Sequence, residues 1–359
     1  MYIHRKQPST RGPIVVAIVA FIATLLIVFG YAILREPEQL VSAFALPDLV
    51  TRTPTLIGEL EATETRPPTA TRRPTLTPTP TFTPTPMATV APTETPYPVV
   101  EHFLFGRPVP PAANSISPDP FYLYGSTRRG DLEVHHGEEF VNPAGTQVIA
   151  VADGTIVVAG PDLLPQCGAG GNELCGRTPD YYGNVIILKL DQQYNGKSVY
   201  VAYGHERRVY VKPGQHVTVG EPLGEIGQAG IALGPHVHVE TRLGVNSYGS
   251  TRNSILWMYP LPGTGALAGR LQDKQGNPVR SATISIYAND VDGTYIGYAE
   301  TYSLDTSPHV NSDDVLAENW AYPDLPAGSY ILRAYIGGLV YSRTVTIEKG
   351  KLTFVVFGG

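Results

Sequence analysis

Histidines gather in three short segments of this chain of 359 residues. The segments are His135 to Glu139, which reads HHGEE, Tyr203 to His205, and Gly234 to His238, which reads GPHVH. Imidazoles and carboxylates are common zinc ligands, and a catalytic zinc site usually takes three protein ligands and keeps one position open for water. The pattern therefore indicates a metal-dependent hydrolase site, assembled from distant parts of the chain, with further histidines left over for acid–base work.

The spacing within the segments suits β-strands, in which alternate residues point to the same face. His135, Gly137 and Glu139 then share one face, as do His236 and His238. Gly137, which has no side chain, leaves room for a metal ion. Zinc lowers the pKa of a bound water to about 7, and a nearby histidine with an ordinary pKa of about 6.5 can move protons. The alternative interpretation is that these histidines are ordinary core or surface residues that happen to cluster.

Residues 121–245 resemble the LytM/lysostaphin-type peptidases of family M23, also called duplicated hybrid motif proteins. Besides the histidine segments, the resemblance rests on the segments Tyr124–Arg128, Gly145–Gly154, Tyr182–Ile187, Val211–Glu221 and Gly227–Gly230. It implies an M23-type β-sheet peptidase domain that binds Zn²⁺ and hydrolyses a peptide bond in the stem or cross-bridge of peptidoglycan.

The resemblance also implies a role for each residue of the site. His135, Glu139 and His238 take the positions of the zinc ligands. His205 and His236 take the positions of the catalytic pair, which activates the water on the zinc and stabilises the oxyanion. The family usually has Asp where this chain has Glu139, and the extra methylene moves the carboxylate outward. A catalytic position displaced by about 1 Å can cost on the order of a hundredfold in rate.

Three functions are consistent with these features. The first is a membrane-anchored, extracellular zinc endopeptidase acting on peptidoglycan. The second is a non-catalytic M23-like regulator or peptidoglycan-binding protein, in which Glu139 has spoiled the metal site. The third is an adhesin whose C-terminal domain binds carbohydrate or protein.

In this interpretation the residues next to the site have no catalytic role. We expect His136 and Glu138 to fall on the opposite face of the strand and to be solvated, and His216 to lie on the surface. His102 or Asn114 could reach back to the metal as a self-inhibiting ligand, although an exposed polar residue explains each equally well.

The N-terminal part of the chain predicts a membrane anchor followed by a linker. Residues 13–34 form an uncharged apolar run, long enough to cross a hydrocarbon core of about 30 Å. Basic residues precede it, which predicts a cytoplasmic tail over residues 1–12 and folded domains outside the cell or in the wall space. A cleaved signal peptide is the alternative. Residues 35–98 are rich in Thr and Pro and predict a disordered linker.

Charge and cysteine content bear on the possible ligands and on disulfide formation. The formal net charge is −6 and the folded part has no long basic run, so nothing indicates nucleic-acid binding. Cys167 and Cys175 are the only cysteines. In an extracellular protein this pair predicts a disulfide that closes a glycine-rich loop, and the resemblance places that loop near the rim of the cleft.

The rest of the chain predicts an all-β fold in two domains, residues 99–262 and 263–359. Strands rich in β-branched and aromatic residues are expected in the first domain at 148–152, 155–159, 185–190 and 198–203. In the second domain they are expected at 266–272, 282–288, 295–302, 329–336, 339–347 and 352–357. The second domain resembles carboxypeptidase-regulatory-like or prealbumin-like β-sandwiches and has no catalytic cluster.

Overall fold

The computed structural model describes residue 99, residues 101–305 and residues 308–359. The predicted cytoplasmic tail (1–12), transmembrane anchor (13–34) and Thr/Pro-rich linker (35–98) lie outside the described residues and stay predictions. Within the described part of the chain, no helix is long and apolar enough to cross a membrane.

Strands dominate the described residues, as the β-branched and aromatic runs predict. Apart from strands these residues contain two short 3-10 helices, η1 (Tyr248–Ser250) and η2 (Ser254–Leu256), and no α-helix. The all-β prediction is confirmed for this part of the chain. Strands were expected at 148–152, 155–159, 185–190 and 198–203, and β2, β3, β4 and β5 lie there, although β2 ends earlier than expected.

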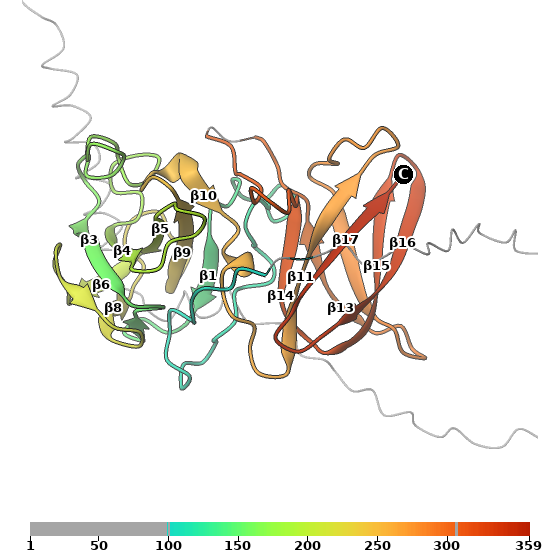
Figure 1. The fold of residues 1–359 in the computed structure, drawn as a ribbon, viewed down its shortest axis with the longest axis horizontal. Helices are drawn as coiled ribbons and strands as arrows, with labels where there is room; N and C mark the ends of the chain where they lie inside the picture. Colours follow the sequence, from blue (N-terminus) through green and yellow to red (C-terminus); the bar gives the residue numbers. More distant parts are fainter. Residues whose placement is uncertain (1–98, 100, 306–307) are drawn as a thin grey trace, which may run out of the picture. The chain divides into compact units, whose positions relative to one another are not determined.

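The first part of the structure is built on one large sheet and one small sheet (Figure 1). The large sheet has the order β1 (Glu138–Val141), β9 (His236–Leu243), β5 (Val199–Gly204), β4 (Asn184–Leu190), β3 (Gly154–Pro161) and β7 (His216–Val217), with β10 (Thr251–Arg252) also paired to β9. The small sheet has the order β2 (Gln147–Ile149), β8 (Pro222–Ile226) and β6 (Glu206–Val209).

Strand β9 lies between β1 and β5 and is buried along its whole length. It runs antiparallel to both neighbours, and its sequence HVHVETRL alternates apolar and polar residues. Val237, Val239 and Leu243 pack into the core. The other face carries a continuous polar row formed by His236, His238, Glu240 and Arg242. Because polar groups buried in this way need partners, the row marks the part of the sheet where function is expected.

The C-terminal part contains two further sheets. One has the order β14 (Trp320–Pro326), β11 (Thr264–Gln272) and β17 (Leu352–Gly358), and the other has the order β13 (Tyr295–Glu300), β12 (Thr283–Ala288), β15 (Gly328–Ile336) and β16 (Leu339–Ile347). All six strands expected here are present. Strand β14 was missed, because its two prolines argue against a strand. It lies at the edge of its sheet, where proline is tolerated. The β-sandwich interpretation stays a prediction.

The two parts share one core and belong to a single compact unit. The ring of Tyr124 packs edge-on against Tyr302 at 5.3 Å between centroids. The backbone of Gly125 lies so close to that ring that a Cβ would come within 2.2 Å of it. The backbone N–H of Ser303 donates to the Gly125 carbonyl at 2.9 Å. The segment that leads to His135 is therefore held by the C-terminal part.

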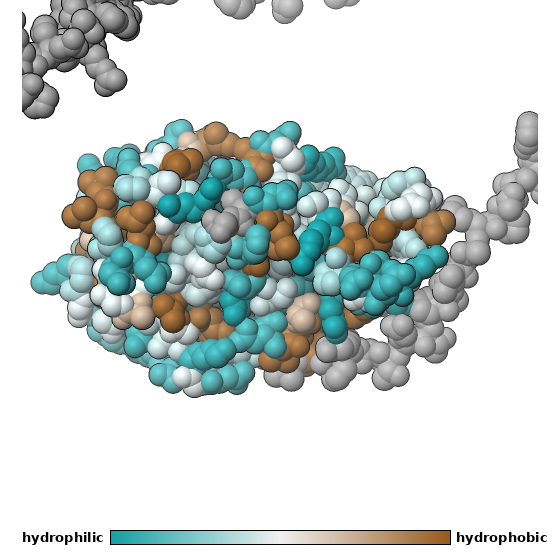
Figure 2. Space-filling model, turned by 90° about the horizontal axis from the view of Figure 1, so that it is seen from above, coloured by the Kyte–Doolittle hydropathy of each residue, from teal (hydrophilic) through white to brown (hydrophobic). Residues whose placement is uncertain are grey.

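Apolar residues on the face drawn in Figure 2 lie in small groups among polar ones. Scattered apolar side chains are normal on a protein surface and carry no functional meaning by themselves. The buried polar residues of the sheet are more informative.

Candidate active site

The register of three strands brings the proposed site together. In the antiparallel pair of β1 and β9, Glu139 lies opposite His238. In the pair of β9 and β5, His238 lies opposite Gly204. His205 follows Gly204 directly, so residues far apart in the sequence meet around one point of β9.

The three residues predicted as metal ligands lie together. One donor atom each from His135, Glu139 and His238 can be chosen so that all lie within 4.8 Å of one another. Nε2 of His135 lies 2.9 Å from Oε1 of Glu139, and Nδ1 of His238 lies 3.2 Å from the same oxygen. All three side chains are buried or nearly so. Their role as metal ligands stays a prediction.

The hydrogen bonds around these rings fit a cation. Nδ1 of His135 donates to the carbonyl of Tyr122 at 2.7 Å, which leaves Nε2 of a neutral ring with a lone pair. Nε2 of His238 lies 3.2 Å from a carboxylate oxygen of Glu240, so Nδ1 of its neutral ring also carries a lone pair. These two atoms lie 3.1 Å apart. Two lone pairs repel at this distance unless a proton or a metal ion lies between them.

The charge of the site leads to the same conclusion. Burial alone would lower the pKa of His238, but the carboxylates of Glu139 and Glu240 outweigh burial and raise the pKa to about 10. Burial would raise the pKa of Glu139, but hydrogen bonds from three histidines hold it well below its usual range. The site therefore favours a positive charge beside an ionised carboxylate, which is the environment that a divalent cation needs.

The predicted catalytic pair lies beside the three ligands. The ring centroids of His205 and His236 are 4.7 Å apart. Nδ1 of His205 donates to the carbonyl of Ala229, and Nδ1 of His236 donates to the carbonyl of Gly234, each at 2.8 Å. Both Nε2 atoms are thus left for other partners, and Nε2 of His236 contacts Glu139. Burial, together with the nearby rings of His238 and His236, lowers the pKa of His205 to about 3.

The backbone of His205 has a φ of 73°, in the left-handed region. A residue with a side chain seldom adopts this conformation, which costs on the order of 1 kcal/mol. His205 lies between the end of β5 and the start of β6, and its N–H donates to the carbonyl of Tyr182 at 2.9 Å. The turn directs the imidazole toward the site.

A second layer of polar residues supports His238, and the sequence motifs did not predict it. Glu240 accepts hydrogen bonds from Nε and Nη2 of Arg242 at 2.9 and 2.7 Å, and from the hydroxyl of Tyr182 at 2.5 Å. Burial would raise the pKa of Glu240, but Arg242 and His238 lower it to about 2. The alternation of polar residues along β9 is the signal that could have found this layer.

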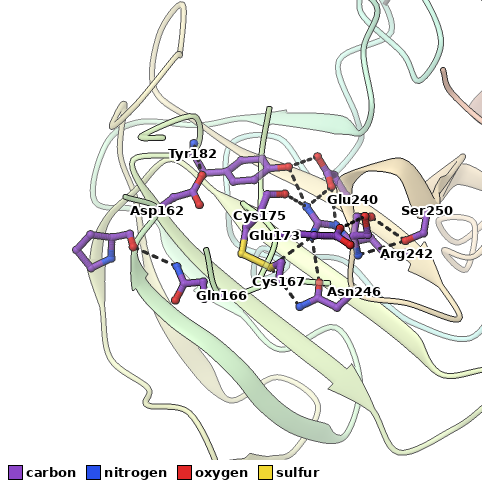
Figure 3. Close-up of a disulfide and its surroundings, with 12 residues drawn as sticks. Asp162, Gln166, Cys167, Glu173, Cys175, Tyr182, Glu240, Arg242, Asn246 and Ser250 are labelled. Carbon is purple, nitrogen blue, oxygen red and sulfur yellow. Dashed lines mark hydrogen bonds and ion pairs between the residues drawn. A yellow bond between two sulfur atoms is a disulfide. The ribbon is translucent and has the colours of Figure 1, made fainter. Parts of the chain in front are cut away.

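The predicted disulfide between Cys167 and Cys175 is present and buried (Figure 3). Nη2 of Arg242 donates to the carbonyl of Cys175 at 2.7 Å, and Nη1 donates to Asn246 at 3.0 Å. The disulfide loop is therefore connected through Arg242 and Glu240 to the ring of His238.

The expectation that His135, Gly137 and Glu139 lie on one strand is wrong. Strand β1 begins at Glu138, so His135 and Gly137 lie in the segment before it. A Cβ at Gly137 would lie 2.5 Å from the carbonyl oxygen of Val239 and 2.7 Å from Nε2 of His238. Glycine is thus needed here because the backbone of β9 and the His238 ring come so close.

His136 and Glu138 are buried, not solvated. The ring of His136 stacks on Tyr248 at 4.2 Å, and its Nδ1 lies 3.1 Å from the hydroxyl of Thr251. Burial raises the pKa of Glu138 well above its usual range. His136 is covered by η1 and β10, which the sequence patterns did not predict.

His216 and His102 lie away from the site. His216 is exposed and paired with Asp191, as expected for a surface residue. His102 is buried, with its ring 4.7 Å from that of Trp257 and its Nε2 3.4 Å from Asp313. These contacts hold His102 in a buried position away from the proposed metal ligands. Asn114 is exposed.

Tyr122 is another residue that the motifs did not single out. Its ring stacks on that of His135 at 4.0 Å with an angle of 3° between the planes, and its backbone carbonyl accepts the hydrogen bond from the same ring. Together these contacts fix the orientation of His135.

Comparison with known proteins finds similarity over part of the chain. Residues 133–250 match the model of peptidase family M23. The peptidoglycan DD-endopeptidase ShyA of Vibrio cholerae is 30% identical over 122 residues, which are 34% of this chain and 23% of that protein. The lipoprotein NlpD/LppB homolog of Pseudomonas aeruginosa is 31% identical over 97 residues, which are 27% of this chain and 26% of that protein.

The chain spans about a quarter of the length of these curated relatives. Among solved structures, the catalytic domain of lysostaphin from Staphylococcus simulans is 22% identical, with a TM-score of 0.27 over 43% of this chain and 88% of that one.

Proposed function

We propose that this chain, which carries a peptidase family M23 domain over residues 133–250, is a zinc endopeptidase that hydrolyses peptide bonds in peptidoglycan. The observation that carries the proposal is the convergence of His135, Glu139 and His238, with lone pairs that face one another and a carboxylate beside them. The similarity to a protein named as a peptidoglycan endopeptidase supports the substrate class.

His135, Glu139 and His238 would hold the zinc ion. A bound zinc ion supplies Lewis acidity, which polarises a peptide carbonyl and makes a water acidic enough to ionise near neutral pH. The protein holds the imidazole rings of His135 and His238 in fixed orientations. The Tyr122 carbonyl orients His135, and Glu240 orients His238, so that each ring presents one defined nitrogen to the metal.

His205 and His236 would handle protons and charge at the reacting peptide bond. Each ring has its Nδ1 hydrogen committed to a backbone carbonyl, so only Nε2 can exchange a proton with the substrate or water. His205 is neutral at pH 7 because its pKa is lowered to about 3. One ring accepts the proton of the attacking water and the other donates to the oxygen that gains charge.

The place of action is also part of the proposal. The apolar run at residues 13–34 and the basic residues before it support a single-pass anchor with the folded domains outside the cell. The disulfide between Cys167 and Cys175 supports an oxidising compartment.

The test is hydrolysis of isolated peptidoglycan by the full-length, zinc-loaded chain, followed by counting new amino termini. We expect release that is lost in His205→Ala and after chelation. A zinc-loaded chain that binds peptidoglycan without releasing amino termini would instead indicate the non-catalytic, regulatory relative.

A further inference from the structure

A cavity of about 600 Å³ lies between the segment before His135 and the C-terminal sheets. The walls that matter here come from Arg129, Glu133, Val134, Arg177, Glu300 and Asp305. None of the roles assigned above uses this cavity.

Two walls of this cavity lead directly to the proposed metal ligands. Val134 precedes His135 in the chain, and the carbonyl of Glu133 accepts a hydrogen bond at 2.7 Å from the hydroxyl of Tyr122, whose ring stacks on His135. A molecule held against this wall would therefore lie beside the segment that carries and orients His135.

The second wall comes from the end of the disulfide loop. Arg177 follows Cys175 by two residues, and the carbonyl of Cys175 accepts a hydrogen bond from Arg242, which holds Glu240 against His238. Arg177 is thus joined by a short segment to the residues that orient His238.

Four charged groups of the cavity walls divide into two kinds. Glu300 is occupied structurally, because its carboxylate accepts hydrogen bonds from the backbone N–H groups of Thr127 and Arg129. The guanidinium of Arg129 lies over the ring of Tyr298 at 3.9 Å. Arg177 and Glu133 pair with each other instead, and their side chains keep 27% and 67% of their exposure.

An exposed ion pair contributes little to stability and exchanges partners readily. A guanidinium binds a carboxylate through two parallel hydrogen bonds, and a carboxylate binds an ammonium group. A ligand that carries both groups close together can replace each partner of the Arg177–Glu133 pair with one of its own.

We propose that this cavity binds the zwitterionic end of an amino-acid side chain in the peptidoglycan stem, with its carboxylate on Arg177 and its ammonium group on Glu133. The proposal rests on the proposed function for its substrate class. It predicts preference for stems whose diamino acid ends in both an ammonium group and a carboxylate, as in meso-diaminopimelate, over stems whose diamino acid ends in an ammonium group alone, as in lysine.

The test is binding without cleavage, measured by calorimetry on the full-length chain carrying His205→Ala. The probes are the tripeptides L-Ala-γ-D-Glu-meso-diaminopimelate and L-Ala-γ-D-Glu-L-Lys, which differ in the carboxylate at the end of the side chain. We expect the first to bind about tenfold more tightly, as befits one charge-assisted contact. Arg177→Gln should remove this difference, whereas Glu133→Gln should weaken both peptides.

Matched controls are Arg208→Gln and Glu348→Gln, which remove the same charges elsewhere on the surface and should change nothing. A diaminopimelate peptide whose side-chain carboxylate is amidated tests the same contact without any change in the protein, and it should bind like the lysine peptide. Equal binding of the two tripeptides, or a preference that survives Arg177→Gln, would overturn the proposal. Because this test measures binding and not cleavage, its outcome does not depend on whether the enzyme assay succeeds.

Discussion

Nε2 of His238 lies 3.2 Å from a carboxylate oxygen of Glu240, on the edge of the ring opposite the nitrogen that faces Glu139. This contact determines which nitrogen of His238 faces the proposed metal. Partners of this kind typically change metal affinity by about 10- to 100-fold when they are removed.

We therefore predict that Glu240→Gln weakens zinc binding by about 10- to 100-fold. The change also leaves Arg242 as a buried, unpaired charge, which should destabilise the fold by about 3–5 kcal/mol. Competition with a chelating dye would measure the affinity, and urea unfolding the stability. Unchanged zinc affinity in a folded variant would show that Glu240 does not orient the ligand.

Glu139 is the residue at which this chain departs from the usual family pattern. Its carboxylate contacts His135, His236 and His238. We predict that Glu139→Gln loses zinc, because it removes the charge of the site, whereas Glu139→Asp keeps zinc but loses about a hundredfold in rate, because the carboxylate is withdrawn by one methylene. Zinc content and initial rates test both variants. Higher activity in Glu139→Asp would mean that the site is built for the shorter side chain.

Gly137 offers a test that changes no ligand. A methyl group there would collide with the carbonyl of Val239 and with the ring of His238, so Gly137→Ala should shift His238 and reduce zinc affinity at least tenfold. The matched control is Gly328→Ala, where the nearest atom lies 3.8 Å from the added carbon. Equal zinc binding by the two variants would contradict the close packing described here.

The disulfide should contribute to both stability and metal binding. Replacing Cys167 and Cys175 with serine opens a loop with a sequence separation of 8 residues, and the loss of cross-link entropy predicts a destabilisation of about 2–3 kcal/mol. Because the Cys175 carbonyl anchors Arg242, zinc affinity should also fall. Thermal unfolding with and without zinc separates the two effects. If zinc affinity is unchanged in the folded variant, the loop stabilises the protein without positioning the site.

Glu318 predicts a particular dependence of stability on pH. Burial raises its pKa to about 8, against an ordinary value of 4.5. Between these pH values the folded state binds the proton and the unfolded state does not, so the contribution of Glu318 to stability falls as pH rises, by at most about 1.4 kcal/mol per pH unit. Urea unfolding at pH 5 and pH 8 should show a shallower decline in Glu318→Gln. An equal decline would assign it to other groups.

The sequence predicted the components of the site better than their setting. Short motifs were enough to name the five residues that meet. Strand register then brings them together, because Glu139 and Gly204 both lie opposite His238, on its two neighbouring strands. The burial of His136 depends on η1 and β10, which carry no strong local pattern. Buried Glu138 accepts a hydrogen bond from the backbone N–H of Tyr124, which is also distant in the sequence. Tyr122 and Arg242 were missed because their importance lies in contacts with residues distant in the sequence.

Strand β14 shows the same limit for the fold. The segment from Trp320 to Pro326 contains two prolines and was not expected to form a strand. Its pairing with β11 alone leaves it at an edge, where the missing N–H groups are tolerated. Local propensity does not reveal which strand will lie at an edge.

The most direct test of the proposed function is a zinc titration of the metal-free, full-length chain on isolated peptidoglycan. We expect the release of new amino termini to rise in proportion to added zinc and to level off at one ion per chain. His205→Ala should bind the same amount of zinc and release nothing. One bound zinc ion per chain without release in the unchanged protein, or release that does not depend on zinc, would contradict the assignment of this site as a zinc peptidase.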